Sequence, residues 1–173
     1  MTTPNDATLK FREALLLASR NLPSEALHAF RELVTSWPGD DLADDALYNV
    51  GACYLAMNQF GLAAEAFQGL LDKYPDATIA SDENGGRESG RTGAKAWLGL
   101  VSARLGVGDL EGAKAACTAL EGYDDSKIHP APGIERTFHD VAAALLVAAE
   151  GHDVDEVDDI GPADFDESAV AED

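Results

Sequence analysis

Apolar residues recur at helical spacing over most of the chain. In the segment 46–54, Leu47, Val50 and Tyr54 fall at i, i+3 and i+7, which places them on one face of a helix. The pattern breaks at 57–61 and resumes over 62–71, and Pro75 then ends the second helix, because the residue before a proline is biased away from the α region. The sequence therefore predicts a helix-turn-helix unit.

This unit is repeated along the chain. Ala26, Phe30 and Pro38 share their internal spacing with Ala63, Phe67 and Pro75, and the two sets lie 37 residues apart. A weaker third unit follows from Trp97 and Leu100. Such a period is typical of stacked helical hairpins, in which each unit buries its apolar face against its neighbours.

At the junctions Tyr74-Pro75 and Trp37-Pro38-Gly39-Asp40, the chain is similar to the tetratricopeptide repeat (TPR) variant of bacterial Tol-Pal-associated and outer-membrane-assembly proteins. The second unit as a whole resembles the TPR family. The matching residues are Leu47, Val50, Gly51, Tyr54, Ala63, Phe67, Leu70 and Pro75. Gly51 leaves room for a neighbouring helix to approach. In the third unit, Val101, Arg104 and Cys117 replace the glycine and aromatic anchors. The resemblance implies an all-α fold, a right-handed superhelix of about three TPR repeats with a C-terminal capping helix.

The pattern divides the chain into a helical repeat domain over 1–152 and a tail over 153–173. We expect repeats at 7–40, 44–77 and 94–127, and a capping helix at 134–150. That helix would present Ile134, Phe138, Val141, Leu145 and Ala148 or Ala149 along one stripe. The insertion 81–93 has four glycines and no aliphatic residue, which predicts a mobile loop. The tail has ten acidic and no basic residues, which predicts disorder.

The net charge of the chain limits the classes of partner that it can bind. Twelve Lys and Arg stand against 32 Asp and Glu, a net charge of −20, which opposes binding to nucleic acid or anionic lipid. This acidity has two explanations: a surface adapted to high salt, or a tail that attracts a basic partner. The longest uncharged apolar run is nine residues, 141–149, whereas membrane insertion needs about 20. Residues 1–20 carry no export-signal pattern, so we expect a cytoplasmic protein.

The sequence predicts no enzyme, no cofactor and no metal site. The histidines His28, His129, His139 and His152 show no metal-binding spacing, and the acidic tail lacks the pattern of a calcium loop. Cys53 and Cys117 have no CxxC spacing, so we interpret both as small buried apolar residues.

The resemblance implies a peptide groove lined by the first helices of the repeats. The corresponding positions are Phe11, Arg12, Leu15 and Ala18, then Tyr48, Asn49, Ala52 and Leu55, then Leu98, Gly99, Ser102 and Leu105. Asn49 holds the place of the asparagine that bonds the ligand main chain in peptide-binding family members. The basic residues of a carboxylate clamp are unmatched, apart from Arg12 and Lys95 nearby.

These positions predict a protein-protein interaction adaptor or scaffold that binds a peptide or helix of a partner protein. Two alternatives stay open. The groove positions could be filled by the chain's own helices or by a second copy, which would make the protein a self-assembling homo-oligomer. The acidic tail could instead sequester a basic partner.

Overall fold

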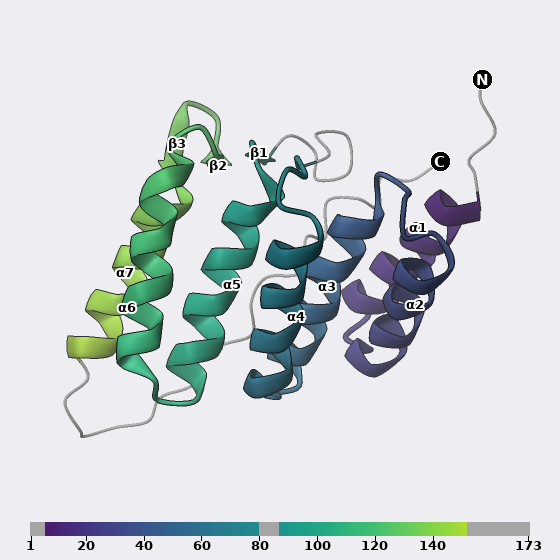
Figure 1. The fold of residues 1–173 in the computed structure, drawn as a ribbon, viewed down its shortest axis with the longest axis horizontal. Coiled ribbons are helices and arrows are strands. Elements are labelled where there is room, and N and C mark those ends of the chain that lie inside the picture. Colours follow the sequence, from purple (N-terminus) through teal and green to yellow (C-terminus); the bar gives the residue numbers. More distant parts are fainter. Residues whose placement is uncertain (1–5, 80–86, 152–173) are drawn as a thin grey trace.

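The computed structural model describes residues 6–79 and 87–151. Within these ranges the fold is mainly helical, and successive helices pack as hairpins side by side (Figure 1). The all-α repeat architecture is thereby confirmed. The helices are α1 (Asp6–Ser19), α2 (Pro23–Ser36), α3 (Ala43–Ala56), α4 (Phe60–Lys73), α5 (Thr92–Gly106), α6 (Leu110–Ala119) and α7 (Phe138–Gly151), with a 3-10 turn, η1 (Leu120–Tyr123), after α6. None of them is long and apolar enough to span a bilayer.

The turn inside each hairpin uses a residue that tolerates left-handed backbone. Asn21, Asn58 and Gly108 have φ values of 58°, 55° and 74°, and each lies between the first and second helix of its hairpin. Asparagine and glycine adopt this conformation more readily than other residues. In the third hairpin, Asp109 then caps α6 by accepting a bond from the Gly112 N–H. The position of each hairpin turn is thus set by residues within the turn itself.

The ends of the second helices are built alike. The N–H groups of Trp37 and Tyr74 donate to Leu33 and Leu70, four residues earlier. The Tyr74 hydroxyl also donates to the Pro38 carbonyl at 3.0 Å, which ties the end of α4 to the end of α2. The two Trp/Tyr-Pro junctions, 37 residues apart, therefore end their helices in the same way and contact each other.

Two apolar clusters form the core of the part of the chain that the structure describes. The N-terminal cluster joins α1, α2 and α3 around Phe30, and the C-terminal cluster joins α4 to α7 around Phe67. The Phe67 ring fits against two glycines: a Cβ placed on Gly51 or on Gly99 would lie 2.5 Å from it. The expectation that Gly51 makes room for a neighbouring helix is confirmed.

A small sheet departs from the sequence-based prediction. Strands β1 (Glu88–Ser89), β2 (Lys127–Ala131) and β3 (Ile134–Thr137) pair antiparallel in that order. The prediction of a mobile loop throughout 81–93 is therefore wrong at Glu88–Ser89, which form β1, and at Thr92 and Gly93, which lie buried in α5. Residues 81–86 are outside the described ranges.

The contact that orders this part of the insertion is distant in sequence. Gly90 has a φ of 106°, and a Cβ there would meet the Ser126 side chain at 2.4 Å. The Ser126 hydroxyl accepts a 2.9 Å bond from the Arg91 N–H. Glycine is needed at this position for both its backbone conformation and the close approach. Composition predicted a loop because the pairing partner lies more than 30 residues away.

The capping helix starts later than expected. Residues 134–137 form β3, so α7 begins at Phe138 and its buried stripe consists of Phe138, Ala142 and the partly buried Leu146. The stripe through Ile134 and Leu145 is wrong, since these side chains are 49% and 36% exposed. The helix packs on α5 and α6 as the terminal element of the described chain. The tail 153–173 lies outside the described residues.

Candidate interaction face

Two parallel stripes on α3 and α5 form the candidate site. Tyr48, Ala52 and Leu55 lie at i, i+4 and i+7 on α3, and Leu98, Ser102 and Leu105 have the same spacing on α5. All six are partly exposed, and α3 packs directly on α5. Lys95 of α5 contacts the stripe on α3, because its Nζ lies 4.4 Å from the centroid of the Tyr48 ring. We call these six residues, together with Asn49, the α3–α5 face.

Several predicted groove residues are core residues instead. Phe11 is 2% exposed, and its ring lies edge-on to Phe30 with 5.7 Å between centroids. Ala18 is buried in the same cluster, and Gly99 is buried against Phe67. The expectation that these residues line a groove is wrong, because α1 packs along α2 and the glycine accommodates a ring from α4.

The two remaining predicted residues of α1 do not join the face. Arg12 is exposed, whereas Leu15 is partly buried against the N-terminal cluster. The structure therefore brings together the predicted residues of α3 and α5 apart from Gly99, whereas Phe11, Leu15 and Ala18 of α1 pack in the N-terminal cluster. The sequence did not reveal this, because which side of α1 is buried depends on how the helix packs on its neighbours.

Two polar side chains of the α3–α5 face, Asn49 and Ser102, make bonds within their own helices. The Asn49 Nδ2 donates to the Asp45 carbonyl at 2.8 Å, and the Ser102 hydroxyl donates to the Leu98 carbonyl at 3.3 Å. The amide nitrogen of Asn49 carries two hydrogens, and the bond to Asp45 uses one of them. The second hydrogen and Oδ1 take no part in this bond. The orientation of Asn49 is thus fixed by its own helix.

A charged cluster lies at the end of the face that is formed by the starts of α3 and α5. The Lys95 Nζ lies 2.9 Å from Glu88 Oε2, in β1. Burial opposes the charge on Lys95, but the nearby carboxylates of Glu88 and Asp45 hold its pKa above the ordinary value. Lys95 is therefore protonated and engaged inside the chain, which argues against its use in a carboxylate clamp. Burial also raises the pKa of Tyr48.

A buried polar pair lies beside this cluster. The Thr92 hydroxyl donates to Asp44 Oδ2 at 2.7 Å, and both residues are buried. Burial raises the pKa of Asp44, while the Thr92 bond acts to lower it. The pair ties the start of α5 to the start of α3, across 48 residues of sequence. Sequence reasoning missed Asp44, Thr92 and Glu88, because no local pattern links them.

The thiols and possible metal ligands offer no reactive site in the described residues. Cys53 and Cys117 are free and buried, as expected of apolar packing residues, and burial raises the pKa of Cys53 to about 12. The described part of the chain contains no group of three or more His, Cys, Asp or Glu that could hold a metal ion.

One family comparison bears on this face. Residues 45–77, which span most of α3 and all of α4, match the family model described as tetratricopeptide repeat. A comparison with curated proteins found no match. The chain therefore carries a helical hairpin similar to the tetratricopeptide repeat, a module that generally mediates protein-protein interaction.

Proposed function

We propose that the protein is a non-enzymatic adaptor that binds a peptide or helix of a partner protein on the α3–α5 face. The observation that carries this proposal is the pair of matched stripes, in which Ala52, Leu55, Leu98 and Leu105 remain partly exposed on two helices in contact. Apolar residues at helical spacing on a scaffold suit the apolar side of an amphipathic helix or of an extended segment.

The polar groups of the face limit what the ligand can be. Asn49 retains one N–H and its Oδ1 beyond the bond to Asp45, so it can pair with a ligand main chain. Lys95 is engaged with Glu88, and Asp44 and Asp45 lie on the adjacent turn of α3. The proposed ligand is therefore held by apolar contacts and main-chain bonds, without an anchoring carboxylate.

The test compares partner capture by two variants. In Leu55→Glu with Leu98→Glu, charges replace one apolar side chain in each stripe, and we expect capture of the partner to fall on the order of tenfold or more. Val147→Glu is the control, since this side chain is 69% exposed on α7. Partners captured by the wild type are identified by mass spectrometry, and far-UV circular dichroism checks that each variant is folded. Equal capture by the double variant and the control would contradict the proposal.

A further inference from the structure

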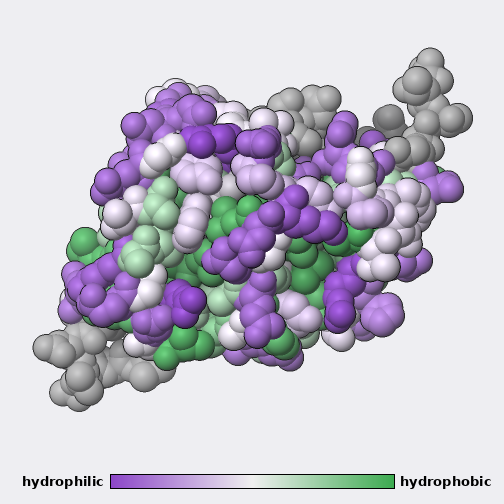
Figure 2. Space-filling model, in the orientation of Figure 1, coloured by the Kyte–Doolittle hydropathy of each residue, from purple (hydrophilic) through white to green (hydrophobic). Residues whose placement is uncertain are grey.

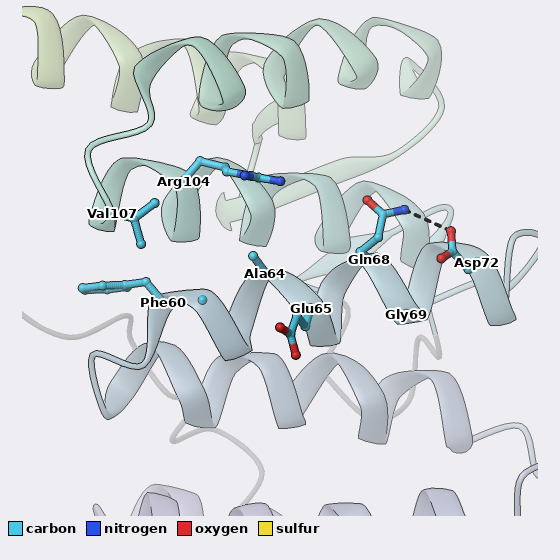
Figure 3. Close-up of a pocket in the computed structure, with 9 residues that line it drawn as sticks. Phe60, Ala64, Glu65, Gln68, Gly69, Asp72, Arg104 and Val107 are labelled. Carbon is cyan, nitrogen blue, oxygen red and sulfur yellow. Dashed lines mark hydrogen bonds between the residues drawn. The ribbon is translucent and has the colours of Figure 1, made fainter.

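A second surface lies between α4 and the end of α5. It is a hollow of about 480 Å³, whose lining includes Phe60, Ala64, Gln68 and Asp72 of α4 together with Arg104 and Val107. Figure 3 shows Phe60 and Val107 at one end, Gln68 and Asp72 at the other, and Ala64 between them. On this side of the molecule, apolar surface gathers near the middle, interrupted by hydrophilic residues (Figure 2). None of the lining residues belongs to the α3–α5 face, and we call them the outer hollow.

Two glycines on α4 leave its backbone without side-chain cover beside this hollow. Gly61 and Gly69 lie within α4 and line the hollow, and a Cβ on either would meet nothing within 4 Å. Glycine weakens a helix relative to alanine, and no contact with the described chain requires it at these positions. Gly106 is different, because a Cβ there would meet the Phe60 ring at 2.4 Å. Gly61 and Gly69 allow another backbone to approach α4 closely.

The charges around the hollow favour a basic occupant. Glu65 and Asp72 are exposed on α4, seven residues and therefore about 10.5 Å apart along the helix. Asp72 accepts a 3.0 Å bond from Gln68, which leaves its negative charge in place. The cation of the hollow, Arg104, is paired with Asp109 at 3.0 Å. The rim is therefore negative in a chain whose net charge is −20.

We propose that the outer hollow is a docking site for a basic amphipathic helix of a partner protein. An apolar side chain of that helix packs between Phe60, Ala64 and Val107, and its Lys or Arg residues reach Glu65 and Asp72. The helix backbone lies against Gly61 and Gly69. This site is independent of the α3–α5 face, so the protein has two surfaces on which polypeptides can bind.

The test uses the full chain and a defined probe. The probe is a fluorescent helical peptide of about 16 residues, made of Ala, Leu and Lys with the leucines on one face. An isomer of the same composition with scattered leucines controls for charge. At physiological salt we expect the amphipathic peptide to bind at least about tenfold more tightly than its isomer, as measured by fluorescence anisotropy.

Two kinds of variant localise the binding. Glu65→Lys with Asp72→Lys should weaken it at least about tenfold, whereas Glu25→Lys with Asp41→Lys, an equal change of charge at exposed positions elsewhere, should weaken it less than about twofold. Gly69→Leu should also abolish binding by filling the approach to α4. This variant should not lower the melting temperature, because leucine favours a helix more than glycine does.

Four results would overturn the proposal. Equal binding of the isomer, or equal weakening by both charge-reversal pairs, would show only general attraction to an acidic chain. Hydrogen-exchange protection in 48–55 and 98–105, rather than in 60–72 and 104–107, would place the peptide on the α3–α5 face. Self-association in sedimentation that Gly69→Leu abolishes would assign the hollow to a second copy. The variant Leu55→Glu with Leu98→Glu should bind the peptide normally, which separates this proposal from the adaptor function above.

Discussion

Phe67 couples two neighbouring hairpins through a single side chain. Its ring lies against Gly51 of α3 and Gly99 of α5, and its centroid is 5.6 Å from that of Tyr48. The repeat spacing identifies Phe67 as an anchor, and the sequence indicates only that Gly51 leaves room for a neighbouring helix. The resemblance to the TPR family placed Gly99 in the groove, because it assigns positions within a repeat and does not say which neighbour a ring contacts.

At this scale we predict that Gly99→Ala lowers the free energy of unfolding by about 1–3 kcal/mol, since the added methyl group would overlap the Phe67 ring. Phe67→Leu in the same background should recover part of the loss. The control is Gly61→Ala, whose Cβ would meet open space and should leave stability unchanged or raise it. Urea unfolding measures all three. A loss of equal size in Gly61→Ala would show that the cost does not come from the ring.

Among the elements, α7 has the most explicit start signal. The Asp140 N–H donates to the Thr137 hydroxyl at 3.0 Å, and the Thr137 N–H donates to Asp140 Oδ2 at 2.9 Å. These reciprocal bonds form a capping box over Thr137-x-x-Asp140. The sequence contains this signal, but apolar periodicity extended the helix back to residue 134. The pairing of Ile134–Thr137 with β2 overrides that periodicity.

We predict that Thr137→Ala lowers the free energy of unfolding by about 1 kcal/mol at neutral pH. The backbone and side-chain bonds from Thr137 hold the pKa of Asp140 below its ordinary value, with smaller contributions from His139 and Lys127. A carboxyl with a lowered folded-state pKa stabilises the fold above its unfolded-state pKa, and this contribution is lost as the pH falls through the folded-state value. Asp140→Asn should therefore flatten the acid side of the stability profile in thermal unfolding. An unchanged profile would contradict the capping box.

Over 6–79 and 87–151, each hairpin packs on its neighbours, and the buried apolar residues form two clusters. The α1–α2 hairpin meets the rest of the described protein chiefly through α2 and α3, and Leu47 and Tyr54 pack against both clusters. The sheet and the Arg91 contacts with Asp125 and the Tyr123 ring join the start of α5 to the segment after α6. The C-terminal part is therefore bound together by more than helix stacking.

This arrangement predicts local opening of the N-terminal hairpin. Phe30→Ala removes a fully buried ring from the N-terminal cluster, and hydrogen exchange should then lose protection in 6–36 while 60–73 and 92–119 remain protected. The matched variant Phe67→Ala should lose protection on both sides of α4, because that ring contacts α3 and α5. Uniform loss of protection in Phe30→Ala would mean that the chain unfolds as one unit.

The repeat pattern of the sequence predicted the helical hairpins and the break of the second hairpin at 57–61, because these depend on residues within one helix or one turn, whereas the positions on α3 and α5 came from the resemblance to the TPR family. Only the tertiary structure decided that Phe11 is buried, that Glu88 holds Lys95, and that Gly90 lies against Ser126. These contacts join segments far apart in the chain or depend on which neighbour a helix packs against. Helical periodicity gives the face of a helix, whereas packing decides what that face meets.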